Sequence, residues 1–178
     1  MKRILIMLFS GVLILGSIAV KASAATTGAF GISVSVQNTL SISLKDTAGA
    51  DYTNWAITPA VALNSATTMT SANGIKVLIG TSFPIDLNAA AGTSAGGGAW
   101  TAGAVTGSGV YKLELKPFAT TQAAPDLTTG SIVITGTAVQ YDPIVSGDRW
   151  VYAKLTTPTA TTSGQTQTIT VTITATVH

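Results

Sequence analysis

The side chains in this chain that could support catalysis or hold a metal ion are few, and most are carboxylates. The sequence has no cysteine and one histidine, His178, whose place at the last position predicts a fraying end. It therefore lacks the residues for a Ser-His-Asp or Cys-His catalytic arrangement and for a multi-histidine or thiolate metal site. Paired carboxylates remain, since a glycosidase needs two of them across a cleft. The acidic residues are Asp46, Asp51, Asp86, Glu114, Asp126, Asp142 and Asp148.

These acidic residues have the neighbours expected of turns. Most of them stand beside glycine, proline, serine or threonine, where Asp hydrogen-bonds to the nearby backbone. Residues 46–51 and 142–148 each place two carboxylates in one short segment, where cations that prefer oxygen ligands, such as Ca²⁺, could bind. Neither segment has the density of acids of an EF-hand loop, so we interpret both as turns. The sequence thus predicts a protein that is not an enzyme, with no cofactor and no metal site.

Aromatic residues are the other group with a recognisable chemistry, because their rings can stack on sugars. The tryptophans and tyrosines are Trp55, Trp100, Trp150, Tyr52, Tyr111, Tyr141 and Tyr152. In β-rich proteins such residues more often pack in the core or pair across strands. Trp100 differs, because it stands in a Gly/Ala/Ser/Thr-rich stretch, 88–109, that predicts a mobile loop or a weakly paired edge. We expect Trp100 either to return to the core or to be an exposed contact residue.

The elements that position these residues are predicted to be strands, and the clearest lies at the end of the chain. Threonines alternate with apolar residues from Thr168 to Val177, and β-branched residues on both faces favour an extended backbone. The apolar face carries Ile169, Val171, Ile173, Ala175 and Val177. A strand with such a face must cover it and pair its edge. We expect this to happen within the same domain, and donation of the strand to another chain is the alternative.

Further segments have the alternation or the composition of strands, and clusters of Gly, Pro, Asn, Asp and Ser separate them. They are residues 32–44, 52–57, 75–79, 83–87, 110–115, 131–141 and 150–155. No window of helical length shows an apolar stripe with a period of 3.6 residues. These features predict an all-β chain folded as a single antiparallel β-sandwich of about seven to nine strands, either immunoglobulin-like or a jelly roll.

The first 24 residues have the features of a cleaved signal peptide. Lys2 and Arg3 precede an apolar run from Ile4 to Val20, and Ala22-Ser23-Ala24 provides the small residues of a signal-peptidase site. We therefore expect residues 1–24 to be removed and residues 25–178, 154 residues, to form the β-sandwich domain. We expect the mature protein to be extracellular or at the cell surface, after passage through the periplasm if the producing cell has two membranes.

Removal of the leader changes the charge of the chain. It takes away Lys2, Arg3 and Lys21, so that six basic residues remain against seven acidic ones, a formal net charge of −1. A chain of this charge offers no basic patch for nucleic acid or anionic lipid. No apolar run after the leader suits a membrane span. The sequence thus predicts no nucleic-acid partner and no membrane span in the mature protein.

The leader, the alternation in residues 32–44 and the terminal stretch 166–177 together resemble secreted β-sandwich surface proteins of bacteria, including fimbrial or pilin-type subunits. In the fimbrial subunits a terminal strand of one molecule completes the sheet of the next, so the resemblance implies a donated strand. Two features depart from the pattern. The disulfide common in chaperone-assembled pilins is absent, and so is the N-terminal helix of type IV pilins, because the apolar helix here is the leader.

Together with this resemblance, the lack of catalytic groups predicts a secreted, non-enzymatic protein with a structural or adhesive role at the cell surface. The expected form is a filament subunit that assembles by β-strand complementation. Its expected partners are further copies of itself or other cell-surface components. The aromatic residues support an alternative, a carbohydrate-binding module of the cell surface with polysaccharide as its partner.

Overall fold

The structure is a computed structural model that describes residues 40–81 and 83–178. The leader, residues 1–24, and residues 32–39 of the predicted strand 32–44 lie outside the described residues. The described chain is all-β, as the sequence predicts, with one short 3₁₀ helix, η1 (Ser71–Asn73). The strands are β1 (Ile42–Lys45), β2 (Ala66–Thr68), β3 (Ile75–Ile79), β4 (Ile85–Ala91), β5 (Thr101–Ala102), β6 (Val110–Phe118), β7 (Ile132–Ile134), β8 (Val139–Val145), β9 (Arg149–Thr156) and β10 (Val171–Val177). Within these ranges, no helix has the length and apolarity needed to cross a membrane.

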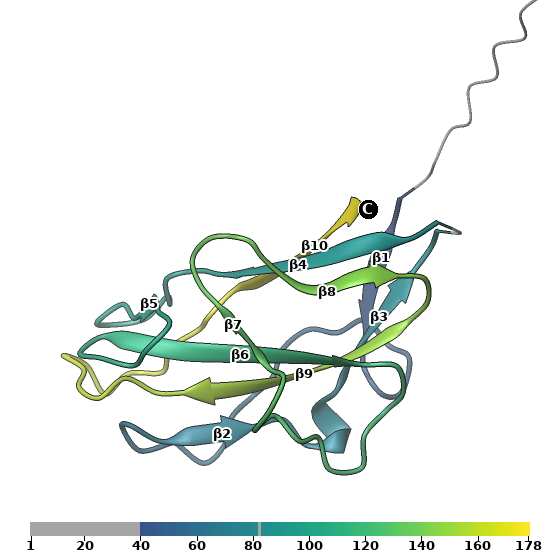
Figure 1. The fold of residues 1–178 in the computed structure, drawn as a ribbon. Helices are drawn as coiled ribbons and strands as arrows, with labels where there is room; N and C mark the ends of the chain where they lie inside the picture. The colour runs from purple at the N-terminus through teal and green to yellow at the C-terminus, as the bar shows by residue number, and fades with distance from the viewer. Residues whose placement is uncertain (1–39, 82) are drawn as a thin grey trace, which may run out of the picture. The chain divides into compact units, whose positions relative to one another are not determined.

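The larger sheet contains seven strands and curls into a half-barrel (Figure 1). Its path runs β1-β3-β9-β6-β5, while β2 pairs with β9 and β7 pairs with β6. β6 and β9 form a long antiparallel centre, from Lys112 opposite Thr156 to Phe118 opposite Trp150. β5 runs parallel to β6, so the prediction of a purely antiparallel fold is wrong there. The glycine-rich loop 103–109 returns the chain beside β5 in the same direction.

The smaller sheet contains β10, β4 and β8 in that order, with β4 at its centre. β10 pairs with β4 along its whole length, from Val171 opposite Ala91 to Val177 opposite Ile85. β8 pairs with the other edge of β4, with shifts in register around Leu87. The terminal strand therefore pairs within its own chain, which is the first of the two alternatives above.

The core is built on the alternation of β4. Its inward side chains, Ile85, Leu87, Ala89 and Ala91, are each at most 1% exposed. Buried apolar residues of the larger sheet, including Val77, Leu113, Leu115, Ile134 and Val151, belong to the same hydrophobic cluster. Removal of this apolar surface from water, at roughly 25 cal/mol per Å², is the main stabilising term that the fold has. The core thus joins the two sheets.

Residues 88–109 differ from the predicted loop in their first four positions. Residues 88–91 continue β4, and the side chains of Ala89 and Ala91 are buried in the core. Alanine contributes little to a hydrophobic pattern, but its small side chain suits a closely packed central strand. The rest of the stretch contains β5, which is two residues long, and an isolated bridge between Ala95 and Thr168. This sparse pairing matches the weakly paired edge that the sequence predicts as the alternative to a mobile loop.

The described chain has ten strands, more than the seven to nine that the sequence predicts. β2, β5 and β7 are two or three residues long, too short to show alternation. The predicted strand 131–141 divides into β7 and β8 around Gly136. Residues 52–57 are also predicted to be a strand, but they do not form one. The Tyr52 N–H still donates to the Leu44 carbonyl of β1 (3.0 Å), and beyond Tyr52 the backbone moves away from β1.

Candidate functional site

An open groove of about 1070 Å³ lies beside the first half of β10, where Val171 and Ile173 line it. Its floor includes Leu113 and Leu115 of β6 and Leu155 of β9, all from the larger sheet and each almost fully buried. Residues of the irregular segment 52–63 form one wall, and residues of the stretch 161–173 form the other. Leu63 of the first wall is 46% exposed and Val171 of the second is 36% exposed, so the groove is open to solvent. We call this feature the β10 groove.

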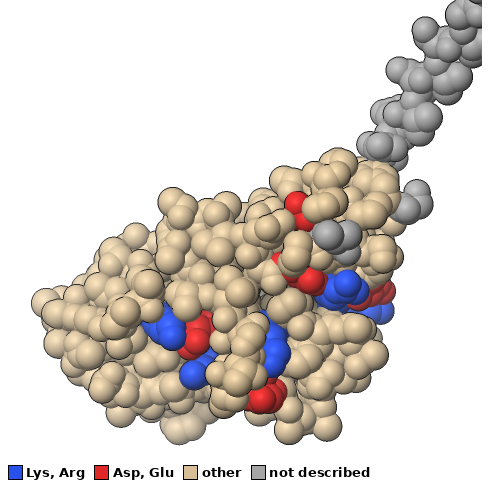
Figure 2. Space-filling view, viewed as in Figure 1, with Lys and Arg blue, Asp and Glu red and all other residues tan. Residues whose placement is uncertain are grey.

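The lining of the β10 groove is neutral and largely apolar. Among the described residues that line it, none carries a charge. Trp55 and Trp100 contribute two aromatic rings, while Asn54, Gln165 and Gln167 contribute amide groups. On the face that Figure 2 shows, which is mostly uncharged, lysine and arginine side chains lie next to aspartate and glutamate side chains. The groove thus suits a neutral ligand with an apolar face and not a charged one.

The apolar face of β10 is covered less completely than that of β4 beside it. Val171 is 36% and Val177 is 58% exposed, and Ile169, Ile173 and Ala175 are only partly buried. The opposing side chains of β4 are essentially inaccessible. Val171, Ile173, Ala175 and Val177 alternate along β10 and so share a face, whereas Ile169 precedes the strand. The fold leaves part of this face, at Val171 and Ile173, open toward the β10 groove.

The outer edge of β10 has unpaired backbone groups. Among the described strands, β4 is the only one that pairs with β10. The Gly92 N–H donates to the Thr170 carbonyl (2.9 Å), so residues 170, 172, 174 and 176 direct their backbone groups toward β4. In an antiparallel pair these directions alternate, and Val171, Ile173, Ala175 and Val177 therefore direct their N–H and C=O groups outward. This edge can accept another strand.

Trp100 is partly buried. Its ring packs against the core, and its indole Nε1 donates a hydrogen bond to Thr161 Oγ1 (3.0 Å). Its backbone N–H donates to Ser94 Oγ (2.7 Å), and the Ser94 hydroxyl donates in turn to Gln167 Oε1 (2.7 Å). Trp100 also lines the β10 groove. These bonds hold the glycine-rich stretch against the segment that precedes β10.

The paired acids of the predicted turns have turn and ion-pair partners. Asp46 Oδ1 accepts hydrogen bonds from the N–H groups of Ala48 and Ala50, both at 2.9 Å. Asp51 pairs with Lys45 at 2.7 Å, which lowers the pKa of its carboxyl. The described residues contain no group of three or more His, Cys, Asp or Glu side chains that could hold a metal ion. Residues 46–51 thus form a closed turn.

The second pair, in residues 142–148, is divided between two partners. Asp142 lies 2.8 Å from the Arg149 guanidinium, and Asp148 lies 3.2 Å from the Lys76 ammonium group. Burial raises the pKa of the Asp142 carboxyl, although Arg149 acts in the opposite direction. The histidine, His178, lies 2.9 Å from Asp86 through its Nδ1 atom and also donates its backbone N–H to Pro84. These contacts hold the last residue of the chain against β4, where the sequence predicts fraying.

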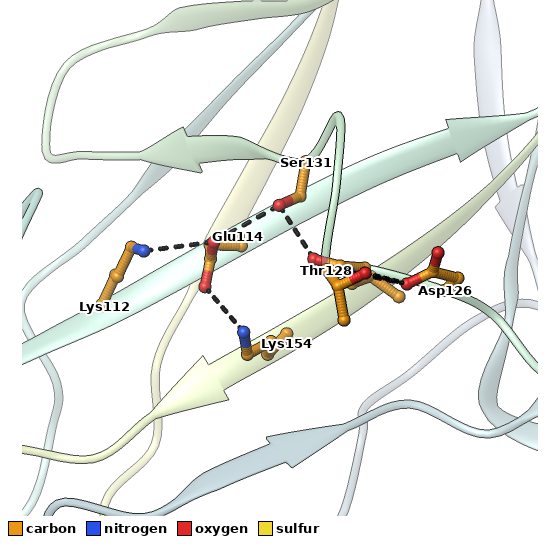
Figure 3. A network of polar contacts seen from close by, with 7 residues as sticks. Lys112, Glu114, Asp126, Thr128, Ser131 and Lys154 are labelled. Atoms are coloured by element: carbon orange, nitrogen blue, oxygen red, sulfur yellow. Dashed lines mark hydrogen bonds and ion pairs between the residues drawn. The ribbon is translucent and has the colours of Figure 1, made fainter.

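Glu114 is the most buried acid, with 8% exposure, and lies in a polar network on the larger sheet (Figure 3). Lys112 Nζ is 3.1 Å from its Oε1 atom, Lys154 Nζ is 3.5 Å from its Oε2 atom, and Ser131 Oγ donates to it at 3.3 Å. Burial alone would raise the pKa of Glu114, but Lys112, Lys154 and Ser131 together lower it. Glu114 alternates with Leu113 and Leu115, so it lies on the face of β6 opposite the β10 groove.

Sequence reasoning missed the β10 groove and its wall 52–63. The available signal was the spacing of Trp55 and Ile57, which alternate as in a strand and do line the groove, although no strand forms there. Comparison with known proteins adds no further assignment. No protein-family model, curated protein or solved structure matches this chain.

Proposed function

We propose that this chain is a secreted, non-enzymatic structural or adhesive protein of the cell surface that serves as a filament subunit and assembles by β-strand complementation. The observation that carries this proposal is the β10 groove. It combines an apolar floor, an exposed strand edge and a neutral lining, which are the features that an added strand requires.

The partners of the carboxylates support a role without catalysis. Asp46 is held by turn hydrogen bonds, Asp142 and Asp148 by ion pairs, and Glu114 by two lysines. A carboxylate committed to such partners is a poor general acid or base, since its proton affinity is fixed by its neighbour. These contacts give no support to a hydrolase that uses paired aspartates.

The proposal also includes the finer architecture. The curled sheet and the three-stranded sheet would form the two layers of a β-sandwich, and the β10 groove would be the place where the layers remain open between β10 and the segment 52–63. An added strand there would lie beside β10 and cover Ile173 and Val171.

Electron microscopy and light scattering of the purified mature chain, residues 25–178, test this function. We expect filaments or oligomers whose mass increases with protein concentration, and filaments of the same width on the producing cells. A chain that stays monomeric at high concentration and binds to no cell-surface fraction would show that the proposal is wrong.

A second candidate function, carbohydrate binding, has one observation in its favour. Trp55 and Trp100 line the same groove, with the amides of Asn54, Gln165 and Gln167 nearby in its lining. Sugars are bound by aromatic rings together with amide and hydroxyl groups, so the groove has suitable chemistry.

Affinity electrophoresis against a panel of polysaccharides tests the second candidate. If it is correct, Trp55→Ala and Trp100→Ala each weaken binding at least tenfold. Trp150→Ala should leave binding unchanged, because Trp150 does not line the groove. Equal binding by all three variants and the unmodified chain rules out the groove as a sugar site.

A further inference from the structure

The β10 groove sets three chemical requirements for its ligand. The exposed or partly exposed apolar side chains of its walls, Leu63, Val171 and Ile173, require an apolar face. The neutral lining disfavours charge, because an ion buried there would have no opposite charge beside it. The outward N–H and C=O groups of Val171 and Ile173 require complementary backbone groups. An extended peptide with one apolar face satisfies all three, whereas a lipid chain has no polar groups for the strand edge and a sugar has no matching row of N–H and C=O groups.

One segment of this chain has these properties. In residues 32–37, Ile32, Val34 and Val36 alternate with Ser33, Ser35 and Gln37. Residues 25–39 contain no charged side chain, which matches the uncharged lining of the groove. The segment therefore offers an apolar face, a polar face and a backbone that can pair.

The position of this segment in the chain favours a second copy as its source. β1 begins at Ile42, and Leu44 of β1 lines the groove. A tight two-residue reversal at Asn38–Thr39 would pair Val36 with Ser41. Cross-strand partners share a face, so the apolar residues of the segment would then lie on the side opposite to Leu44 and away from the groove. A segment from another molecule has no such restriction.

We infer that the β10 groove binds residues 32–37 of a second copy of this chain, which add a strand beside β10. The inference rests on the proposed function and names its partner. It also reverses the role that the resemblance to fimbrial subunits implies for the terminal strand, since β10 is the acceptor edge and the N-terminal segment is donated.

The absence of cysteine from the sequence allows a direct cross-linking test on the mature chain, residues 25–178. Ile173→Cys is combined in one chain with Ile32→Cys, Val34→Cys or Val36→Cys, and the variants are oxidised during assembly. Cross-strand neighbours approach closely enough for a disulfide. We expect a ladder of covalent multimers on a non-reducing gel for at least one of these pairs.

The matched controls combine Ile173→Cys with Ser33→Cys or Ser35→Cys, whose side chains lie on the opposite face of the donated segment. The ladder should be at least tenfold weaker for these variants. A disulfide that forms only within monomers would show that a chain fills its own groove and would overturn the inference. Ladders of equal strength for both sets, or no cross-link with any pair, would overturn it as well.

The same experiment separates this inference from the proposed function. If the unmodified chain forms filaments and none of the apolar positions cross-links to Ile173→Cys, the filament role stands and the donated segment is wrong. If the unmodified chain forms no filaments or oligomers, both are wrong. In the assembling chain, Val34→Asp should reduce the assembled fraction at least tenfold and Ser35→Asp should not, because only the first places a charge in the apolar groove.

Discussion

At the scale of single residues, Glu114 shows how this protein tolerates a buried charge. Two lysines and a serine surround its carboxylate, and they lower its pKa below the ordinary value of 4.5 even though burial acts in the opposite direction. A carboxylate whose pKa is lowered by folding stabilises the fold in its charged form, and loss of the charge leaves two ammonium groups close together. Glu114 is therefore expected to be structural.

Glu114→Gln should lower the free energy of unfolding at pH 7 by about 1–2 kcal/mol, less than a fully buried pair would cost, because both lysines are partly exposed. A lowered pKa means that the carboxylate stabilises the fold above the unfolded-state pKa and loses this effect as pH falls through the folded-state pKa. Urea unfolding from pH 7 to pH 3 should therefore show the two proteins converging at low pH. A constant difference across this range would contradict the assignment.

The control for this experiment is Asp51→Asn. Asp51 pairs with Lys45 at the surface, where its carboxylate is 86% exposed. Solvent and salt screen such a pair, so its removal should leave the unfolding curve unchanged within error.

Gly74 is a second residue whose identity follows from its surroundings. A Cβ atom at this position would lie 2.8 Å from the ring of Tyr152. That ring is fully buried, and its hydroxyl accepts a hydrogen bond from the Gln122 N–H (2.9 Å), so it has little room to move. Gly74→Ala should destabilise the protein by about 1–3 kcal/mol in urea unfolding. Gly147→Ala, where the added Cβ meets nothing within 4 Å, should change stability by less than about 0.5 kcal/mol.

At the scale of elements, β4 and β10 differ in how completely their apolar faces are covered. Leu87 of β4 is fully buried, while Ile173 of β10 is partly exposed to the groove. In the monomeric chain, Leu87→Ala should cost about 2–5 kcal/mol and Ile173→Ala only about 1 kcal/mol. If both substitutions lowered the free energy of unfolding of the monomer equally, the apolar face of β10 would be covered as well as that of β4. The groove would then have no uncovered apolar surface for an added strand.

The sequence predicts some elements well and others poorly for physical reasons. β3 has the predicted bounds, and β6, β9 and β10 begin or end within three residues of them, because each shows clear alternation or a dense apolar composition. The second half of β4 escapes prediction because Ala89 and Ala91 carry little hydrophobic signal. β2, β5 and β7 are too short to show a period of two.

The groove itself could not be predicted from the sequence. It brings together residues 52–63, 113–115 and 161–173, whose proximity depends on long-range strand order and not on local pattern. The sequence does predict which face of β10 is apolar. It cannot predict that Val171 and Ile173 line an open groove while the apolar face of β4 is fully buried, because burial depends on which strands pack together.

At the scale of the whole molecule, assembly by an uncharged segment in an uncharged groove should depend little on salt. Between 0.01 and 1 M salt the screening length falls from about 30 Å to about 3 Å, which weakens attraction between charged surfaces. Sedimentation velocity should show an assembled fraction of the mature chain that is equal or greater at high salt, since sulfate and similar salts strengthen apolar burial. Dissociation at high salt would instead indicate assembly through charged surfaces.

The most direct test of the central claim, self-assembly through the β10 groove, compares the mature chain with Val171→Asp and Thr172→Asp by sedimentation velocity and electron microscopy. Val171 lines the groove, and Thr172 lies on the opposite face of the same strand, so the variants differ only in where the charge points. Circular dichroism of each variant is the control for its folding. We predict that the unmodified chain and Thr172→Asp form filaments while Val171→Asp remains monomeric. Filaments from all three proteins, or from none, would contradict this account.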